Sequence, residues 1–208
     1  MKPPVITLSR EFASMGRTIA QRVAQKLNIE ILDRDIVAEA TRRMNMTIPE
    51  ISRLDEHPGY NRFFMRRTYL FNFGVYNSSE KLFEVESNVI QDYAEKGNCI
   101  IVGRCAESIL RKRENMLRVY IYAPFESRLR HCMEELQLGG KEESEADIRR
   151  VDEARNAYRR RHAASGNPYD NFDLIINSAT FGIDGSAELI AAVAKKQLHG
   201  LDNMKRPH

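Results

Sequence analysis

The sequence has no tryptophan, only three cysteines and no long run of apolar residues. The cysteines, Cys99, Cys105 and Cys132, form no C-x-x-C motif and have no metal-type spacing, so we expect reduced thiols rather than a disulfide scaffold. No stretch approaches the ~20 apolar residues of a membrane span, and no apolar signal segment precedes the first predicted strand. These absences indicate a cytoplasmic protein with no membrane partner.

A large excess of one charge is also missing. The 32 Lys and Arg residues stand against 29 Asp and Glu residues, and the formal net charge is +3. Because nucleic-acid-binding domains typically carry a stronger basic stripe, we expect anionic small molecules rather than nucleic acid as partners. No internal repeat or low-complexity linker divides the 208 residues, and this length suits a single domain or a core with insertions.

Short apolar runs alternate with segments of helical periodicity, which predicts an α/β fold with a parallel sheet. The strongest strand signal is Cys99–Val102, an unbroken apolar run typical of a strand covered on both faces. We expect five strands, at residues 4–9, 28–32, 99–102, 119–122 and 173–177, and a last helix at 185–197.

Charged or polar residues directly follow four of these strands: Arg10, Asp33-Arg34, Gly103-Arg104 and Asn177-Ser178. In open parallel sheets, ligands bind outside the carboxyl ends of the strands. The sequence therefore predicts a ligand site at this edge of the sheet.

The segment after the first strand resembles a phosphate-binding loop. A turn of mostly small residues, Ala13-Ser14-Met15-Gly16, precedes a cation, Arg17, in the first turn of a predicted helix. Backbone N–H groups at such a helix start can face an anion, and Thr18 holds the hydroxyl position that would face Mg²⁺. The Gly-x-x-x-x-Gly-Lys-Ser/Thr pattern is incomplete, because Glu11 replaces the first glycine and Arg17 the lysine. The alternative is an ordinary strand–turn–helix with a surface arginine.

Several motifs along the chain resemble the cytidylate-kinase-like family of P-loop nucleoside monophosphate kinases. They are S-R-E-F-A-S-M-G-R at 9–17, L-D-R-D-I at 32–36, I-V-G-R at 101–104, Asp152-x-x-Arg155, and F-D-L-I-I-N at 172–177. The resemblance covers nearly the whole chain in the family's order. It implies a P-loop three-layer sandwich, a single domain of residues 1–208, an acceptor-binding insertion at about 38–85 and a lid at about 137–166.

The resemblance also implies ATP-dependent phosphoryl transfer to a nucleoside monophosphate, with CMP or dCMP as the expected acceptor. Loop residues 13–18 (Ala13, Ser14, Met15, Gly16, Arg17 and Thr18) would bind ATP, with Thr18 on Mg²⁺. The implied catalytic residues are Arg17, Asp33, Arg155 and Arg159, and the implied acceptor-binding residues are Asp33, Arg62, Arg66, Arg104 and Asp152.

The chain departs from the family pattern at three places. Ala13 and Met15 stand where the family has glycine, Cys105 replaces the carboxylate of a G-R-D motif, and Asp33-Arg34-Asp35 replaces D-T-G. These changes leave open the base of the acceptor. They also leave open a nucleotide-binding sensor or scaffold without turnover, and a kinase for a non-nucleotide small molecule.

Two strand-end residues keep simpler interpretations. Asp33 could cap the helix predicted to follow it, instead of orienting an acceptor or a metal-bound water. Arg104 could be a surface or partner-paired arginine, instead of binding the acceptor phosphate with a bidentate contact.

A very polar helix is predicted at about 145–162. At 100° per residue, Arg149, Asp152, Arg155 and Arg159 lie on one face about 120° wide. A cationic face after a Gly-Gly loop is typical of a lid that closes over ATP and brings arginines to the transferred phosphoryl group. The alternative is a solvated helix with internal ion pairs.

Residues 57–77 contain seven aromatic side chains. Arg62 and Arg66, spaced i, i+4, could contact the acceptor nucleotide while an aromatic ring stacks on its base. The aromatic residues could instead form a small core or a homodimer contact.

Overall fold

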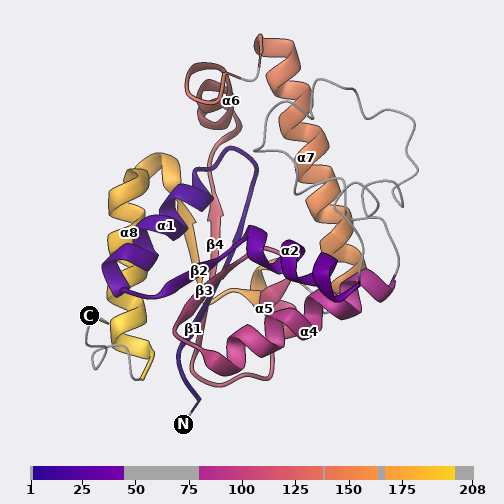
Figure 1. The fold of residues 1–208 in the computed structure, drawn as a ribbon. Helices are drawn as coiled ribbons and strands as arrows, with labels where there is room; N and C mark the ends of the chain where they lie inside the picture. The colour runs from indigo at the N-terminus through magenta and orange to yellow at the C-terminus, as the bar shows by residue number, and fades with distance from the viewer. Residues whose placement is uncertain (1, 45–79, 138, 164–166, 200–208) are drawn as a thin grey trace.

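The computed structural model describes residues 2–44, 80–137, 139–163 and 167–199 (Figure 1). Five strands form one parallel sheet in the order β2-β3-β1-β4-β5. The strands are β1 Val5–Arg10, β2 Glu30–Leu32, β3 Cys99–Val102, β4 Met116–Tyr122 and β5 Leu174–Asn177. Because all five run the same way, their carboxyl ends share one edge, as the sequence predicted.

Helices α1 (Gly16–Leu27) and α8 (Ser178–Gln197) cover one face of the sheet. The apolar residues of α1 recur with helical spacing, and Ile19, Ala20 and Val23 are fully buried against Ile6 and Leu8 of β1. This packing explains why α1 forms where it does, since burial of an amphipathic face supplies most of a helix's stability.

Helices α2 (Arg34–Arg43), α4 (Glu80–Lys96) and the short α5 (Ala106–Ile109) cover the opposite face. Ile101 of β3 and Ile90 of α4 are fully buried in this second core. The expected three-layer α/β sandwich is therefore confirmed.

Helices α6 (Phe125–Glu134) and α7 (Lys141–His162) form a further small core above the carboxyl edge. Ile148 and Val151 of α7 pack there with Leu129 of α6 and with Phe12, from the loop after β1. Figure 1 shows α7 descending from the region of α6 toward the start of α4, so that one long helix borders the ligand edge of the sheet.

Helix α8 begins earlier than the predicted 185–197. The Asn177 side chain accepts a hydrogen bond from the Ala179 amide and starts the helix at Ser178, and Gly182 (φ 64°) then interrupts its path. A short 3-10 helix, η3 (Pro168–Asn171), precedes β5.

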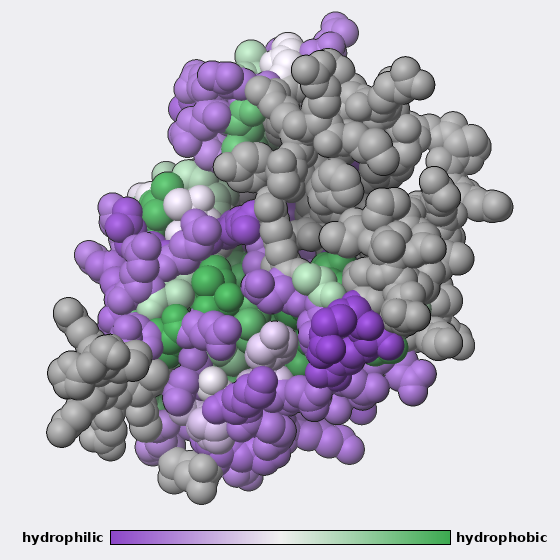
Figure 2. Space-filling view, viewed as in Figure 1, coloured by the Kyte–Doolittle hydropathy of each residue, from purple (hydrophilic) through white to green (hydrophobic). Residues whose placement is uncertain are grey.

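The surface in Figure 2 is mostly hydrophilic where it is coloured, with apolar side chains gathered near the position of the edge strand β2 in Figure 1. None of the described helices has the length and hydropathy that crossing a bilayer requires. The aromatic segment 57–77, with Arg62 and Arg66, lies outside the described residues. Its role in acceptor binding or in a homodimer stays a prediction.

Candidate active site

The loop between β1 and α1 follows the backbone path that glycines would favour. Ala13 (φ 58°) and Met15 (φ 59°) both adopt left-handed conformations, at the two positions where the sequence departs from the family's glycines. This conformation costs a residue with a side chain about 1–2 kcal/mol. Met15 immediately precedes α1, whose first backbone N–H groups have no acceptor within the helix. The strained backbone at Ala13 and Met15 therefore lets α1 begin with free N–H groups that can bind an anion.

Hydrogen bonds from buried serines fix the loop in place. The Ser14 hydroxyl is fully buried and donates to the carbonyls of Glu11 (2.9 Å) and Ile121 (3.3 Å). The Ser178 hydroxyl in turn donates to the Ser14 carbonyl at 2.8 Å. The side chain of Ser14 is therefore structural, and its part in a phosphate site would come from its backbone. Thr18 lies exposed in the first turn of α1.

Two glycines enclose the side chain of Arg10, the last residue of β1. A Cβ atom on Gly16 would lie 2.7 Å from the Cβ of Arg10, and one on Gly103 would lie 2.5 Å from Nη1 of Arg10. Gly103 also has a positive φ of 81°. Neither position admits a larger side chain without displacing Arg10 or the backbone beside it.

Asp33 joins the end of β1 to the first turn of α1. Its carboxylate is 7% exposed and faces Arg17 Nε at 3.0 Å and Arg10 Nη2 at 3.6 Å. Although Asp33 directly precedes α2, its side chain makes no capping hydrogen bond. The simpler interpretation of Asp33 as a helix cap is therefore wrong. Its role toward a metal-bound water or an acceptor stays a prediction.

Helix α7 is fastened to the loop by Asp152. Oδ1 of Asp152 accepts a hydrogen bond from the Phe12 amide (2.8 Å), and Oδ2 pairs with Arg128 of α6. Arg128 also donates to the Phe12 carbonyl (3.2 Å) and faces Glu11 at 3.4 Å. The contacts of Asp152 are thus with the loop and α6, and its predicted contact with an acceptor is untested.

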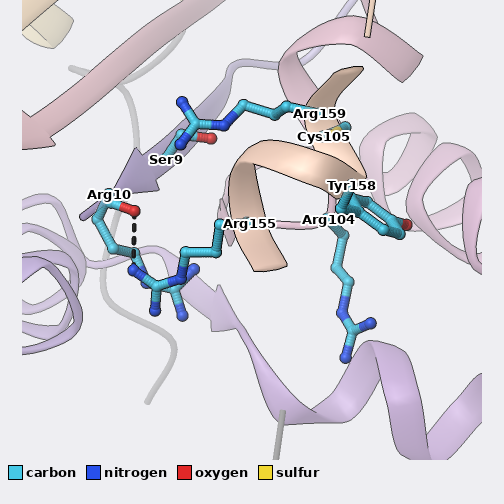
Figure 3. A pocket seen from close by; sticks show the side chains of 8 residues that line it. Ser9, Arg10, Arg104, Cys105, Arg155, Tyr158 and Arg159 are labelled. Carbon is cyan, nitrogen blue, oxygen red and sulfur yellow. Dashed lines mark hydrogen bonds between the residues drawn. The ribbon is translucent and has the colours of Figure 1, made fainter. Parts of the chain in front are cut away.

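A cleft lies where β1, the turn after β3 and α7 meet. It is lined by Ser9, Arg10, Gly103, Arg104, Cys105, Arg155, Tyr158 and Arg159. Figure 3 shows the side chains of Arg10, Arg155 and Arg159 around the cleft, with Arg155 directed toward the backbone carbonyl of Arg10. Arg155 Nη1 donates to the Arg10 carbonyl at 2.8 Å, and Arg159 Nη2 donates to the Tyr120 hydroxyl at 3.4 Å. Three of its arginines, Arg10, Arg155 and Arg159, make the cleft favourable for an anion, whereas the fourth, Arg104, is paired with a buried glutamate.

Arg104 lies in this cleft but extends away from Arg10 and Arg155 (Figure 3). Its side chain is 3% exposed, and Nη1 faces Glu86 Oε1 of α4 at 3.0 Å. Glu86 also accepts a hydrogen bond from the Tyr158 hydroxyl at 3.2 Å. Burial raises the pKa of Glu86, and the Arg104 guanidinium opposes that rise. The interpretation of Arg104 as a partner-paired arginine is confirmed, and its contact with an acceptor phosphate stays a prediction.

A second buried carboxyl lies behind the cleft. The Ser9 hydroxyl donates to Oε2 of Glu107 at 3.0 Å, and burial raises the pKa of Glu107. Burial also raises the pKa of the Cys105 thiol, so this cysteine stays protonated at neutral pH. Arg10, Glu86 and Glu107 were absent from the predicted site residues. Of these three residues, only Arg10 had a feature in the sequence that could have identified it as a site residue, because it directly follows a predicted strand.

The five parallel strands in this order, with helices on both faces, form an α/β fold that several solved structures share. Solved structures with this fold include an uncharacterized protein from Eubacterium ventriosum (TM-score 0.69, 18% identity, covering 94% of this chain and 99% of that one). Shikimate kinase from Acinetobacter baumannii, in complex with shikimate, is also similar (TM-score 0.53, 17% identity, covering 93% and 94%). So is the YorR protein of Bacillus subtilis in complex with phosphorylated GDP (TM-score 0.50, 13% identity, covering 92% and 95%).

At these identities the likeness shows the fold alone. The model of the cytidylate kinase-like family matches residues 5–180, and the chain belongs to that family. No curated protein matches the sequence. Membership of a kinase-like family implies a nucleotide cofactor, typically with Mg²⁺, and a small-molecule substrate.

Proposed function

We propose that the protein transfers the γ-phosphoryl group of ATP to a nucleoside monophosphate, with CMP or dCMP as the first acceptors to test. The observation that carries this proposal is the cleft at the carboxyl edge, where Arg10, Arg155 and Arg159 gather beside the loop before α1, while Arg104 pairs with Glu86 in the wall of the cleft. A kinase of two phosphorylated substrates needs such a concentration of positive charge, because the donor and acceptor phosphates repel each other.

The loop at residues 13–18 is the proposed donor site. The amides at the start of α1 would bind the β- and γ-phosphates of ATP, and Arg17 would supply the side-chain charge. Mg²⁺ usually keeps several waters and takes one or two protein ligands besides phosphate oxygens. An exposed hydroxyl at Thr18 fits this requirement, and Asp33 fits a role through a metal-bound water. When bound, Mg²⁺ would neutralise charge on the β- and γ-phosphate oxygens.

The proposed reaction needs positioning and charge neutralisation rather than a covalent intermediate. An oxygen of the acceptor's phosphate attacks the γ-phosphorus, and the bond from that phosphorus to the β,γ-bridging oxygen breaks. The products are ADP and a nucleoside diphosphate. Arg17, Arg155 and Arg159 would stabilise the charge on the transferred group, with Asp33 orienting Arg17.

The proposed lid is residues 137–166, which include α7 with its Arg155 and Arg159. The proposed acceptor-binding insertion is residues 38–85. Support for the lid comes from the contacts of Asp152 and Arg155 with the backbone of Phe12 and Arg10, just before the donor loop, since movement of α7 would move Arg155 and Arg159 relative to ATP.

A coupled assay of ADP release tests the proposal with CMP, dCMP, UMP, AMP and, as a non-nucleotide acceptor, shikimate. We expect turnover with a pyrimidine monophosphate, and a loss of about 10²-fold or more in kcat for Arg155→Gln and Arg159→Gln. Arg150→Gln, on the exposed side of the same helix, is the matched control and should keep full activity.

The other outcomes separate the alternative functions. If shikimate is the only acceptor that is turned over, the acceptor is a non-nucleotide small molecule rather than a nucleoside monophosphate. Tight binding of ATP without turnover on any acceptor would favour a nucleotide-binding sensor or scaffold, and would refute the proposed reaction.

A further inference from the structure

We infer that Tyr120 of β4 is a positioning residue, whose ring and hydroxyl hold Arg159 of α7 in place to meet the transferred phosphoryl group. This inference rests on the proposed function, which gives Arg159 its part in the reaction. It adds the residue through which the orientation of Arg159 depends on the sheet. Tyr120 would act through Arg159 and would need no contact with either substrate.

The first argument is the contact between the two side chains. The guanidinium carbon of Arg159 lies over the ring of Tyr120, 5.1 Å from its centroid, and Nη2 donates to the Tyr120 hydroxyl at 3.4 Å. A cation over an aromatic face is attracted by the electrons of the ring, and the attraction grows when water is excluded. A hydrogen bond of 3.4 Å is long and contributes less. The ring face therefore supplies most of the interaction that holds Arg159.

The second argument is that Tyr120 is itself fixed. Its strand is paired on both sides, with Ser9 of β1 and Ile175 of β5 in register with Tyr120. The residue is 8% exposed, and its ring packs against the ring of Phe172, with the two centroids 4.9 Å apart. A long arginine populates many rotamers, and a fixed ring against it reduces that number before the substrates bind. An arginine of α7 is thus aligned by a residue of the sheet.

The third argument is that a tyrosine orients an arginine without neutralising it. Arg104, in the same cleft, is paired with the Glu86 carboxylate, which cancels part of the charge that a guanidinium could offer to a phosphate. Burial raises the pKa of Tyr120, so its hydroxyl stays neutral at neutral pH. A further hydrogen bond of Arg159, to Oδ1 of Asn156 at 3.3 Å, also goes to a neutral oxygen. These two partners hold Arg159 without cancelling its charge.

Steady-state kinetics with the best acceptor test the inference. We expect Tyr120→Leu, which removes the ring and the hydroxyl, to lower kcat about tenfold or more, with both KM values changed less than about threefold. Tyr120→Phe keeps the ring face, so its kcat should stay within about threefold of the wild type. Tyr169→Leu is the matched control and should keep full activity, since this tyrosine is 60% exposed.

A double variant separates positioning from a structural role. If Tyr120 acts through Arg159, adding Tyr120→Leu to Arg159→Gln should lower kcat less than about threefold further, because the group that Tyr120 holds is already absent. A residue that only stabilises the fold would give the same loss in both backgrounds. Urea unfolding of each variant shows whether the rates are measured on folded protein. If Tyr120→Leu does not fold, Tyr120→Met takes its place, since a flexible thioether fills an irregular gap.

A nuclear Overhauser effect between the ring protons of Tyr120 and the side-chain protons of Arg159 tests the contact in the wild type, with no variant and no substrate. We expect this cross-peak, because the guanidinium carbon lies 5.1 Å from the ring centroid. Its absence would overturn the inference, whatever the kinetics show.

The outcomes distinguish this inference from the proposed function. Suppose that the wild-type protein turns over a nucleotide acceptor. If Tyr120→Leu then keeps its kcat within about threefold, or loses as much in the Arg159→Gln background as alone, the inference is overturned and the proposed function stands. If the wild-type protein turns over no nucleotide acceptor, the proposed function fails, and the role assigned to Tyr120 fails with it.

Discussion

Asp152→Ala should loosen α7 from the segment that follows β1 and destabilise the whole protein. The substitution removes the acceptor of the Phe12 amide hydrogen bond, at 2.8 Å, and one of the two carboxylates that face Arg128. Hydrogen bonds to charged groups contribute about 1.5–3 kcal/mol, and breaking a buried ion pair costs about 3–5 kcal/mol. Arg128 would keep Glu11 at 3.4 Å, and the Asp152 side chain is 20% exposed.

We therefore expect the substitution to lower the free energy of unfolding by about 3 kcal/mol, the lower end of the range for breaking a buried ion pair. For a domain of this size, that loss corresponds to a fall of about 6–12 °C in Tm. Asp152→Asn keeps an acceptor for the Phe12 amide and should lose less.

Urea unfolding followed by far-UV circular dichroism measures the effect, since the chain has no tryptophan for fluorescence. Glu153→Ala, at the next position of α7, is the control. Its carboxylate is 68% exposed and pairs only with Arg160 among the described residues, so the substitution should cost less than about 1 kcal/mol. If Asp152→Ala stays within about 1 kcal/mol of the wild type, then α7 is not fastened to the loop as argued.

Two further predictions concern the buried carboxyls. Because burial raises the pKa of Glu107, the folded state binds its proton more tightly than the unfolded state, and stability falls as the pH rises above 4.5. The Tm of Glu107→Gln should therefore be higher than that of the wild type at pH 8, and the two values should converge near pH 5. The control Glu142→Gln, at an exposed position, should change the Tm little. A lower Tm for Glu107→Gln than for the wild type at pH 8 would contradict this reasoning. Glu86→Ala leaves the Arg104 guanidinium buried without the carboxylate it faces, and should cost about 3 kcal/mol in urea unfolding. Replacing Glu86 and Arg104 together by Met should recover most of that loss, and a double variant as unstable as Glu86→Ala would count against a buried ion pair.

Local patterns in the sequence predicted much of the fold. The apolar run Cys99–Val102 forms β3 at the expected residues, because a strand buried on both faces needs little more than continuous hydrophobicity. Helix α7 begins at Lys141, four residues before its predicted start, since the Glu143 side chain accepts a hydrogen bond from the Gly140 amide and caps the first turn. That capping pair lay in a stretch that the polar composition had suggested was a loop.

The sequence predicted where the site lies, but it did not predict most of the contacts between the side chains there. The rule for strand ends correctly brought Arg10, Asp33 and Arg104 to one edge of the sheet. It could not tell that Asp33 pairs with arginines rather than capping α2, or that Arg104 extends toward α4, because both depend on side chains distant in sequence. Glu86 and Glu107 were missed for the same reason, since a glutamate inside a helical segment resembles an ordinary surface residue until its burial is known.

Binding of Mg·ATP, measured by isothermal titration calorimetry on the wild type and on Arg17→Ala, tests the central claim most directly. If the amides at the start of α1 and the Arg17 guanidinium hold the β- and γ-phosphates, the wild type gives a saturable heat. The variant should then bind at least about tenfold more weakly, since it loses a charge-assisted contact with the phosphates. No heat with the wild type, or equal affinity in the two proteins, would contradict the claim.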